Sequence, residues 1–500
     1  MEILETPLTV AATTVPPATT AAADADVPSF GRQFTWLLRK ELWTHMQGRR
    51  VYVGAAICFV LCMLAGAVRI HDYGQAHELR NGFLQRWIPS VEEQLERDET
   101  IQVENVRAVS PLSVLSMGLE PVIPFRFTST KEGLRFGESR GAQNVIDALF
   151  GWLDMTFVVT VLLSLLAIAV TFDSVCGERS DGTLALLLSY PVRRSSVLLA
   201  KVGGAISVLT IGFVPALAAV MLLMLIRGVS LMSLVHWLAF GVAAILYLLV
   251  FATLGVAVSA SSPRPADAAL RCLLIWVLLV FVVPRGVGLA VGALRPTQRA
   301  AVLSLREDQA LSQLKVDYSR REQEAFDRYV DESGTSPSAS EDFLRTRKLA
   351  LAELQSRRSE ILRRIWDEMS VEEKHRERWV QTLSLLSPTA LFDQIAAELS
   401  WTGFLQRGLF YEEARTWDEK IGRRLAESRE IFYSGTPQRI TSAFVYRDNI
   451  KPYLVPFQQT WVDSERALAT CALPLAMLAA FAALFFALGY NAFLKLDVRL

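Results

Sequence analysis

The residues that could carry out chemistry in this sequence are few, and they do not form a catalytic set. The motif HELRN, which begins at His77, resembles the start of a His-Glu-x-x-His zinc site but lacks the second histidine. No GxxxxGK[ST] phosphate-binding loop occurs anywhere in the sequence. Cys58 and Cys62 have no neighbouring histidine or carboxylate, which favours a buried structural pair over a metal site. The chain is therefore predicted not to be an enzyme and to bind no metal or cofactor itself.

A more informative segment is the polar loop at residues 177–204, GERSDGTLALLLSYPVRRSSVLLAKVGG. Its leucine-rich centre suits a short helix, with glycine before it and proline after it. Such a helix can place leucines in the groove of a partner while the flanking charges set its register. A tight turn with no partner is the alternative. The residues expected to make the contact are Glu178, Gly182, Thr183, Leu186, Leu187, Pro191 and Arg193.

Two charged residues, Asp154 and Arg285, lie inside apolar stretches. An unpaired charge in lipid costs about 2.5–3.5 kcal/mol on insertion scales, so mutual neutralisation would be favourable. Both are expected toward the same side of the membrane, where they could form an intramembrane ion pair. Each side chain could instead extend separately to the membrane interface.

The hydrophobic pattern predicts that the elements which position these residues are membrane helices. The sequence is 52% hydrophobic and 20% charged, with a mean hydropathy of +0.30. Its 51 basic and 51 acidic residues balance, which gives no electrostatic case for a nucleic-acid partner. Stretches of about 20 apolar residues, the length that a bilayer requires, occur six times. They are residues 51–70, 149–172, 202–226, 234–260, 270–292 and 467–490.

The distribution of lysine and arginine predicts the orientation of these spans. The chain termini and short connections on one side are rich in basic residues, whereas the short loop on the other side, between the third and fourth spans, has only Arg227. Basic short loops stay in the cytoplasm. We therefore expect a multi-pass protein of the bacterial cytoplasmic (inner) membrane with both termini in the cytoplasm. The basic residues on that side are Arg32, Arg39, Lys40, Arg49, Arg50, Arg179, Arg193, Arg194, Lys201, Arg264, Arg271, Lys495 and Arg499.

The predicted fold is all-α: a polytopic membrane protein with about six transmembrane helices and a large helical extracytoplasmic domain. Apolar and aromatic residues at helical spacing on both sides of the SGTSPSAS breaker predict a helical hairpin in that domain. The expected parts are a disordered cytoplasmic tail at 1–30, an interfacial elbow helix at 31–50, transmembrane helices one to five at 51–292 with an extracytoplasmic loop at 71–148, the extracytoplasmic helical domain at 293–466, and the sixth transmembrane helix with a short cytoplasmic tail at 467–500.

The sequence resembles the permease subunits of ABC-2-type ABC transporters. That family has an acidic residue, then Gly-Thr, a leucine-rich stretch, Pro-Val, basic residues and Leu-Leu-x-Lys. The insert before the last span contains the segment LSPTALFDQIAAELSWTG. This insert is similar to that of a branch of the family that includes gliding-machinery and copper-enzyme-maturation permeases. The matching residues are Glu178, Gly182, Thr183, Leu186, Leu187, Leu188, Pro191, Val192, Arg193, Leu198, Leu199 and Lys201.

The resemblance implies a division of labour between subunits. Residues 178–194 would be the coupling helix that docks on a separate ABC ATP-binding subunit, and that subunit would bind ATP and Mg. A second permease copy or a sister permease, together with the lipid bilayer, would complete the assembly. Relatives in this branch differ in cargo, so the resemblance assigns no substrate. The alternative function is a non-transporting membrane scaffold or sensor whose extracytoplasmic helical domain binds a partner protein.

Overall fold

The computed structural model describes residues 30–96, 102–130, 133–137, 153–230, 233–294, 341–432 and 455–496, with scattered positions between 309 and 331. Of the expected tail at 1–30, all but Phe30 lies outside these residues, as does the breaker at 333–340.

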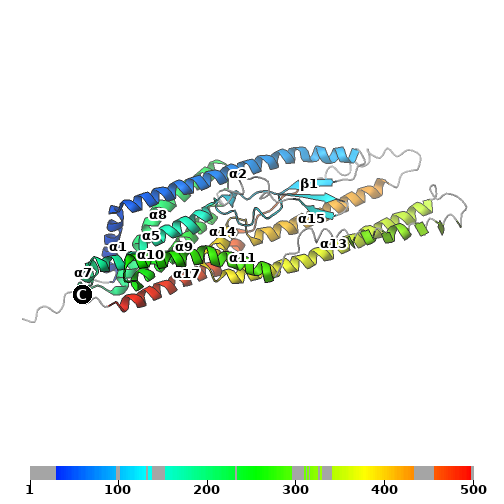
Figure 1. The fold of residues 1–500 in the computed structure, drawn as a ribbon. Helices are drawn as coiled ribbons and strands as arrows, with labels where there is room; N and C mark the ends of the chain where they lie inside the picture. Colours follow the sequence, from blue (N-terminus) through cyan, green and yellow to red (C-terminus); the bar gives the residue numbers. More distant parts are fainter. Residues whose placement is uncertain are drawn as a thin grey trace, which may run out of the picture.

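Six helices in this part of the chain are long and apolar enough to cross a membrane. They lie side by side in an elongated molecule (Figure 1). The expected fold class, a mostly helical protein with about six transmembrane helices, is confirmed. The six are α2 (Arg49–Glu96), the run α4 (Met155–Phe157), η3 (Val158–Leu163) and α5 (Ser164–Thr171), then α8 (Arg194–Ile226), α9 (Leu234–Ser261), the run α10 (Pro265–Val277), η5 (Leu278–Val282) and α11 (Val283–Leu294), and finally α17 (Ser464–Leu494).

One end of the bundle, called here the α1 end, gathers several short or terminal elements. The amphipathic helix α1 (Phe30–Gln47) crosses this end at a steep angle to α2 (Figure 1). The short helices α6 (Cys176–Ser180) and α7 (Thr183–Leu188) lie at the same end, together with the C-terminal end of α17. Both ends of the described chain are therefore on one side of the bundle.

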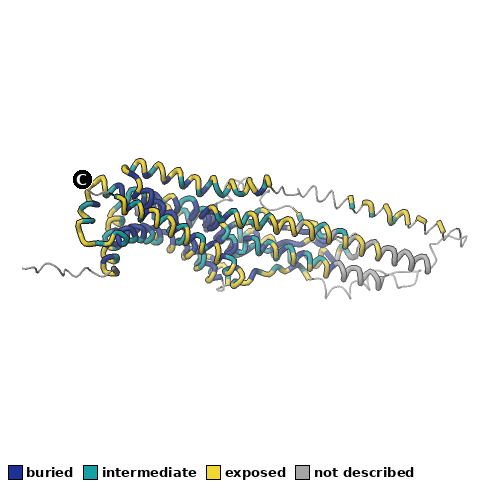
Figure 2. Tube along the Cα trace, turned by 90° about the horizontal axis from the view of Figure 1, so that it is seen from below, coloured by how far each residue is buried: buried dark blue, intermediate teal, exposed yellow. Residues whose placement is uncertain are grey.

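The apolar core runs along the inside of the bundle, where buried residues concentrate (Figure 2). Large side chains such as Phe213, Phe240 and Phe251 are completely buried there, whereas many leucines and valines on the outer faces are exposed. An apolar exterior around an apolar core is what lipid contact requires, since lipid tails are as apolar as leucine.

A further helix, α14 (Pro388–Leu399), is inserted into the bundle and packs against α9 and α17. Its first turn meets two π-helical turns, η3 and η5, which interrupt the regular hydrogen bonding of their helices. Ser387 Oγ donates to the carbonyl of Leu279 at 2.9 Å. The Tyr247 hydroxyl lies 3.0 Å from the carbonyl of Thr160 and 3.1 Å from Thr389 Oγ1. These bonds satisfy polar groups that have no water nearby.

The opposite end, called here the sheet end, contains a small antiparallel sheet that sequence analysis did not predict. Its strands are β1 (Gln102–Val106), β2 (Arg126–Thr130) and β3 (Gly133–Phe136), in the order β1-β2-β3. Gln102 pairs with Thr130 in the first ladder, and Phe127 pairs with Phe136 in the second. The long polar helices α13 (Glu341–Ser384) and α15 (Phe404–Phe432) extend along this end (Figure 1).

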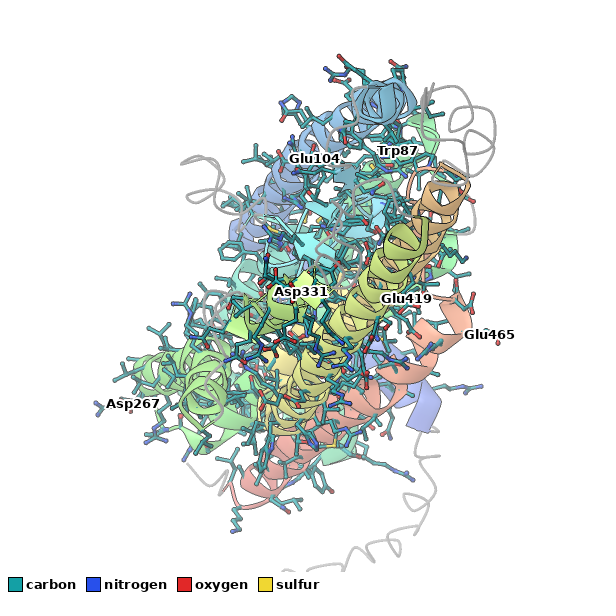
Figure 3. All side chains as sticks on the ribbon, turned by 90° about the vertical axis from the view of Figure 1, so that its right-hand side faces the viewer. Trp87, Glu104, Asp267, Asp331, Glu419 and Glu465 are labelled. Atoms are coloured by element: carbon teal, nitrogen blue, oxygen red, sulfur yellow. The ribbon has the colours of Figure 1, made fainter. Side chains whose placement is uncertain are left out.

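An aromatic core joins the two sequence segments that were expected as separate outer parts. Phe127 of β2 packs edge to face on Phe410 of α15 and on Phe457, with ring centroids 5.9 and 5.0 Å apart. The far end of α2 is held as well, because Trp87 Nε1 donates to the carbonyl of Glu104 in β1 at 2.8 Å (Figure 3). Strand β2 therefore packs against α15 and the segment around Phe457, and α2 is bonded to β1.

A buried ion pair lies beside this aromatic core. Arg107 donates to both carboxylate oxygens of Glu120 at 2.8 and 3.1 Å, and its guanidinium lies over the Phe410 ring. The Arg107 side chain is 2% exposed and that of Glu120 is 9% exposed. Breaking such a pair leaves one charge buried without a partner.

We predict that Arg107→Met lowers the stability of the full chain by about 3–5 kcal/mol, because Glu120 stays buried without its cation. The double change Arg107→Met with Glu120→Leu should recover most of that loss, since both charges are then removed. Thermal unfolding in detergent, followed by tryptophan fluorescence, measures both. A double variant as unstable as the single one would contradict this account.

Candidate functional site

The candidate site is the segment from Val175 to Arg194 at the α1 end, which contains α6 and α7. Gly182 precedes α7 with a backbone φ of +74°, a left-handed conformation that glycine adopts without steric cost. Thr183 Oγ1 then donates to the carbonyl of Glu178 at 3.2 Å. The reversal between the two short helices is thus built by Gly182 and Thr183, two of the residues singled out from sequence.

Four charged side chains hold this segment to its neighbours. Glu178 of α6 accepts from Lys40 of α1 at 2.8 Å and lies 2.9 Å from the ammonium group of Lys201 in α8. Glu41 of α1 completes the group, at 3.1 Å from Lys40 and 3.4 Å from Lys201. We call these four residues the charge network. It joins three helices that are far apart in the sequence.

Burial makes the charge network stronger than a surface ion pair. The Lys201 side chain is 2% exposed and that of Glu41 is 8% exposed, so water screens their charges weakly. Burial alone would lower the pKa of Lys40, but the hydrogen bond to Glu178 and the charge of Glu41 raise it above its usual value. Burial lowers the pKa of the neighbouring His45.

Helix α1 approaches α8 closely enough that a glycine is required. A Cβ atom on Gly204 would lie 2.9 Å from Cβ of Glu41. A second contact lies nearer the start of α1, where the Gln33 side chain amide donates to the carbonyl of Pro191 at 3.2 Å and accepts from the backbone N–H of Arg193 at 3.4 Å. Gln33 therefore holds the C-terminal end of the segment, and Lys40 holds its middle.

Two further contacts fix the ends of the segment to α9 and α17. Ser259 Oγ accepts from the backbone N–H groups of Val175 and Cys176 at 3.0 and 3.2 Å. Arg194 donates to the carbonyls of Phe493 and Leu494 at 3.2 and 3.0 Å, which satisfies the last turn of α17. Both ends of the segment are thus tied to helices of the bundle.

The leucines of α7 divide between the bundle and the surface. Leu184 is 2% exposed, and it packs in an apolar cluster with residues of α1, α8, α9 and α17. Leu187 is partly buried against the same cluster. Leu186 and Tyr190 are 66% and 62% exposed. The exposed large apolar side chains in and just after α7 are therefore Leu186 and Tyr190, and the latter was not singled out from sequence.

The structure gives Asp154 and Arg285 different neighbours. Asp154 caps α4, accepting from the backbone N–H of Phe157 at 2.7 Å and from that of Met117 at 2.9 Å. Arg285 is exposed, with its guanidinium over the Phe281 ring of the same helical run. No ion pair between Asp154 and Arg285 is found in the described part of the chain, and their pairing stays a prediction.

Within the described ranges, no group of three histidine, cysteine, aspartate or glutamate residues is placed to hold a metal ion. The family model for "ABC-2 family transporter protein" matches residues 35–498, which include all six candidate spans. The chain belongs to the ABC-2 transporter family.

Two curated relatives are similar to part of this ABC-2 permease. A probable ABC transporter permease protein NosY from Stutzerimonas stutzeri is 36% identical over 131 residues, which are 25% of this chain and 46% of the relative. The protein of the same name from Pseudomonas aeruginosa is 34% identical over 133 residues, 25% of this chain and 47% of the relative. The matched part thus spans about half the length of these relatives. Permeases of the ABC-2 family are typically non-catalytic membrane subunits.

We predict that Lys201→Met loosens the α6–α7 segment of this ABC-2 permease, because Glu41 and Glu178 lose a buried cation. The cost should be about 3 kcal/mol or more. The variant should unfold at a lower temperature, and trypsin should cleave faster at the exposed Arg179. Lys420→Met, at an exposed lysine of the sheet end, is the matched control and should leave both measurements unchanged. Wild-type cleavage and unfolding in the Lys201 variant would show that the charge network does not hold the segment.

Proposed function

We propose that this ABC-2 permease is the membrane-spanning subunit of an ATP-driven transporter, energised by a separate ATP-binding subunit that docks on residues 178–194. The observation that supports it is the construction of this segment. Four bundle helices tether it, yet its Leu186 and Tyr190 side chains project into solvent. A docked subunit that moves this segment would therefore move α1, α8, α9 and α17 with it.

The orientation is part of the proposal. The exposed basic residues Arg32, Arg179, Arg193, Arg264 and Lys495 gather at the α1 end. The excess of lysine and arginine in short loops marks the cytoplasmic side. The α1 end, with both termini, then faces the cytoplasm of a bacterial inner membrane, and the sheet end lies outside. ATP and Mg bind to the partner subunit in this arrangement.

A second permease copy or a sister permease completes the proposed transporter. The apolar exterior of α10, where Leu270, Leu273 and Leu274 are exposed, offers surface for that subunit or for lipid. Binding of ATP by the partner subunit would shift the pair of permeases between two states, because it favours one arrangement of the docked segments. The cargo remains outside the proposal.

We predict that Leu186→Asp weakens the docking of the ATP-binding subunit. Placing a charge at a desolvated anchor removes about 2 kcal/mol or more of binding, a loss of roughly thirtyfold in affinity. Co-purification of the ABC ATP-binding subunit with the full chain measures it, together with ATP-dependent transport. Val371→Asp, a change at a similarly exposed residue of α13, is the matched control. Full retention of the subunit and of transport by the Leu186 variant would refute the docking site.

The orientation has its own test, which uses single cysteines in a background without the five native ones. Ser370→Cys lies on the exposed surface of α13 at the sheet end, and Ser189→Cys lies beside α7 at the α1 end. We predict that a membrane-impermeant maleimide labels the first variant in intact spheroplasts and the second only after permeabilisation. The reverse labelling pattern would show that the protein has the opposite orientation in the membrane.

A further inference from the structure

The face of α1 that points away from the bundle carries aromatic and basic side chains in one stripe. Arg32, Trp36, Arg39, Trp43 and Met46 recur every three or four residues, so they share one side of the helix. All five are exposed, and the two tryptophans are 61% and 66% exposed. Large exposed aromatic side chains on a helix mark a surface that something covers.

The opposite face of α1 packs against the helix bundle. Gln33, Leu37 and Glu41 are all buried toward the bundle, where α1 packs against α8. Because α1 crosses the end of the bundle at a steep angle to α2 (Figure 1), the helix lies roughly along the membrane plane. The stripe is therefore presented at the level where the spans leave the bilayer.

The side chains of the stripe indicate which kind of ligand covers it. Tryptophan rings concentrate at the headgroup level of bilayers, and guanidinium groups bind phosphate oxygens. Glu41 is the only acidic residue of α1, and it is turned inward, so the stripe is purely basic. Neither Arg32 nor Arg39 belongs to an ion pair within the described ranges. We infer that this face of α1 binds the headgroups of anionic phospholipids.

Lipid binding there bears on the proposed function, on which this consequence rests. The inner face of the same helix holds the coupling segment through Gln33 and Lys40. A lipid layer that fixes the outer face of α1 therefore also fixes the position of that segment relative to the bilayer. The composition of the cytoplasmic leaflet would thereby tune how firmly the segment is held.

The test compares two lipids at the same protein. The full chain is reconstituted into phosphatidylcholine vesicles in which about a third of the lipid is brominated, either as phosphatidylglycerol or as phosphatidylcholine. Bromine quenches tryptophan fluorescence on contact. We expect Trp36 and Trp43 to be quenched with a roughly fivefold preference for phosphatidylglycerol, since two arginines lie beside them. Trp36→Phe with Trp43→Phe should remove that preference from the signal.

Matched charge variants decide the result. Arg32→Gln with Arg39→Gln should abolish the preference, whereas Arg32→Lys with Arg39→Lys should keep it. Arg320→Gln with Arg364→Gln, at two exposed arginines of the outer helices, should leave it unchanged. Equal quenching by both lipids in the wild type, or a preference that survives the glutamine changes, would overturn the inference.

A further outcome also counts against it. If removal of Trp36 and Trp43 left quenching by both lipids unchanged, α1 would be covered by protein rather than by lipid. The measurement needs no ATP-binding subunit and no transport. It can therefore fail while the docking test at Leu186 succeeds, and the two results remain separate.

Discussion

Two carboxylates and two ammonium groups share one partly buried site where α1, α6 and α8 meet, and the arrangement of the whole α1 end depends on it. A buried charge is costly without a partner, so no one of these helices can move away alone without exposing or orphaning a charge. Gly204 lets α1 come close enough for the contact to form. A segment that would otherwise be a surface loop thus behaves as part of the helix bundle.

A second polar constraint acts deeper in the bundle, where α14 is held by side chains rather than by apolar packing alone. His236 donates through Nδ1 to the carbonyl of Leu399 at 2.7 Å, and its Nε2 lies 2.9 Å from Ser464 Oγ. At the other end of α14, Ser387 and Thr389 meet the π-helical turns. These contacts link α9, α14 and α17, so the elements that carry the sheet end are joined directly to the membrane helices.

Much of the fold could be predicted because lipid imposes a simple rule of length and polarity, which the six apolar stretches obey. The reversal at Gly182 and Thr183 was also visible in sequence. The partners of Glu178 were not, because Lys40 is 138 residues away and helical periodicity cannot report such pairing. Leu186 and Leu187 are adjacent in the sequence, and the leucine pattern does not show which of the two side chains is exposed and which is half-buried. The sheet was missed because strands of four or five residues without strict alternation resemble loops.

Helix α2 continues without a break from Arg49, next to α1, to Trp87, which is hydrogen-bonded to β1. That stretch is about 57 Å long at the normal rise of a helix, close to twice the thickness of the hydrocarbon core. It therefore acts as a lever arm. A tilt of about 5° at its Arg49 end would displace Trp87 by about 5 Å. A small rotation on one side of the membrane would therefore become a displacement on the other side that is longer than a hydrogen bond.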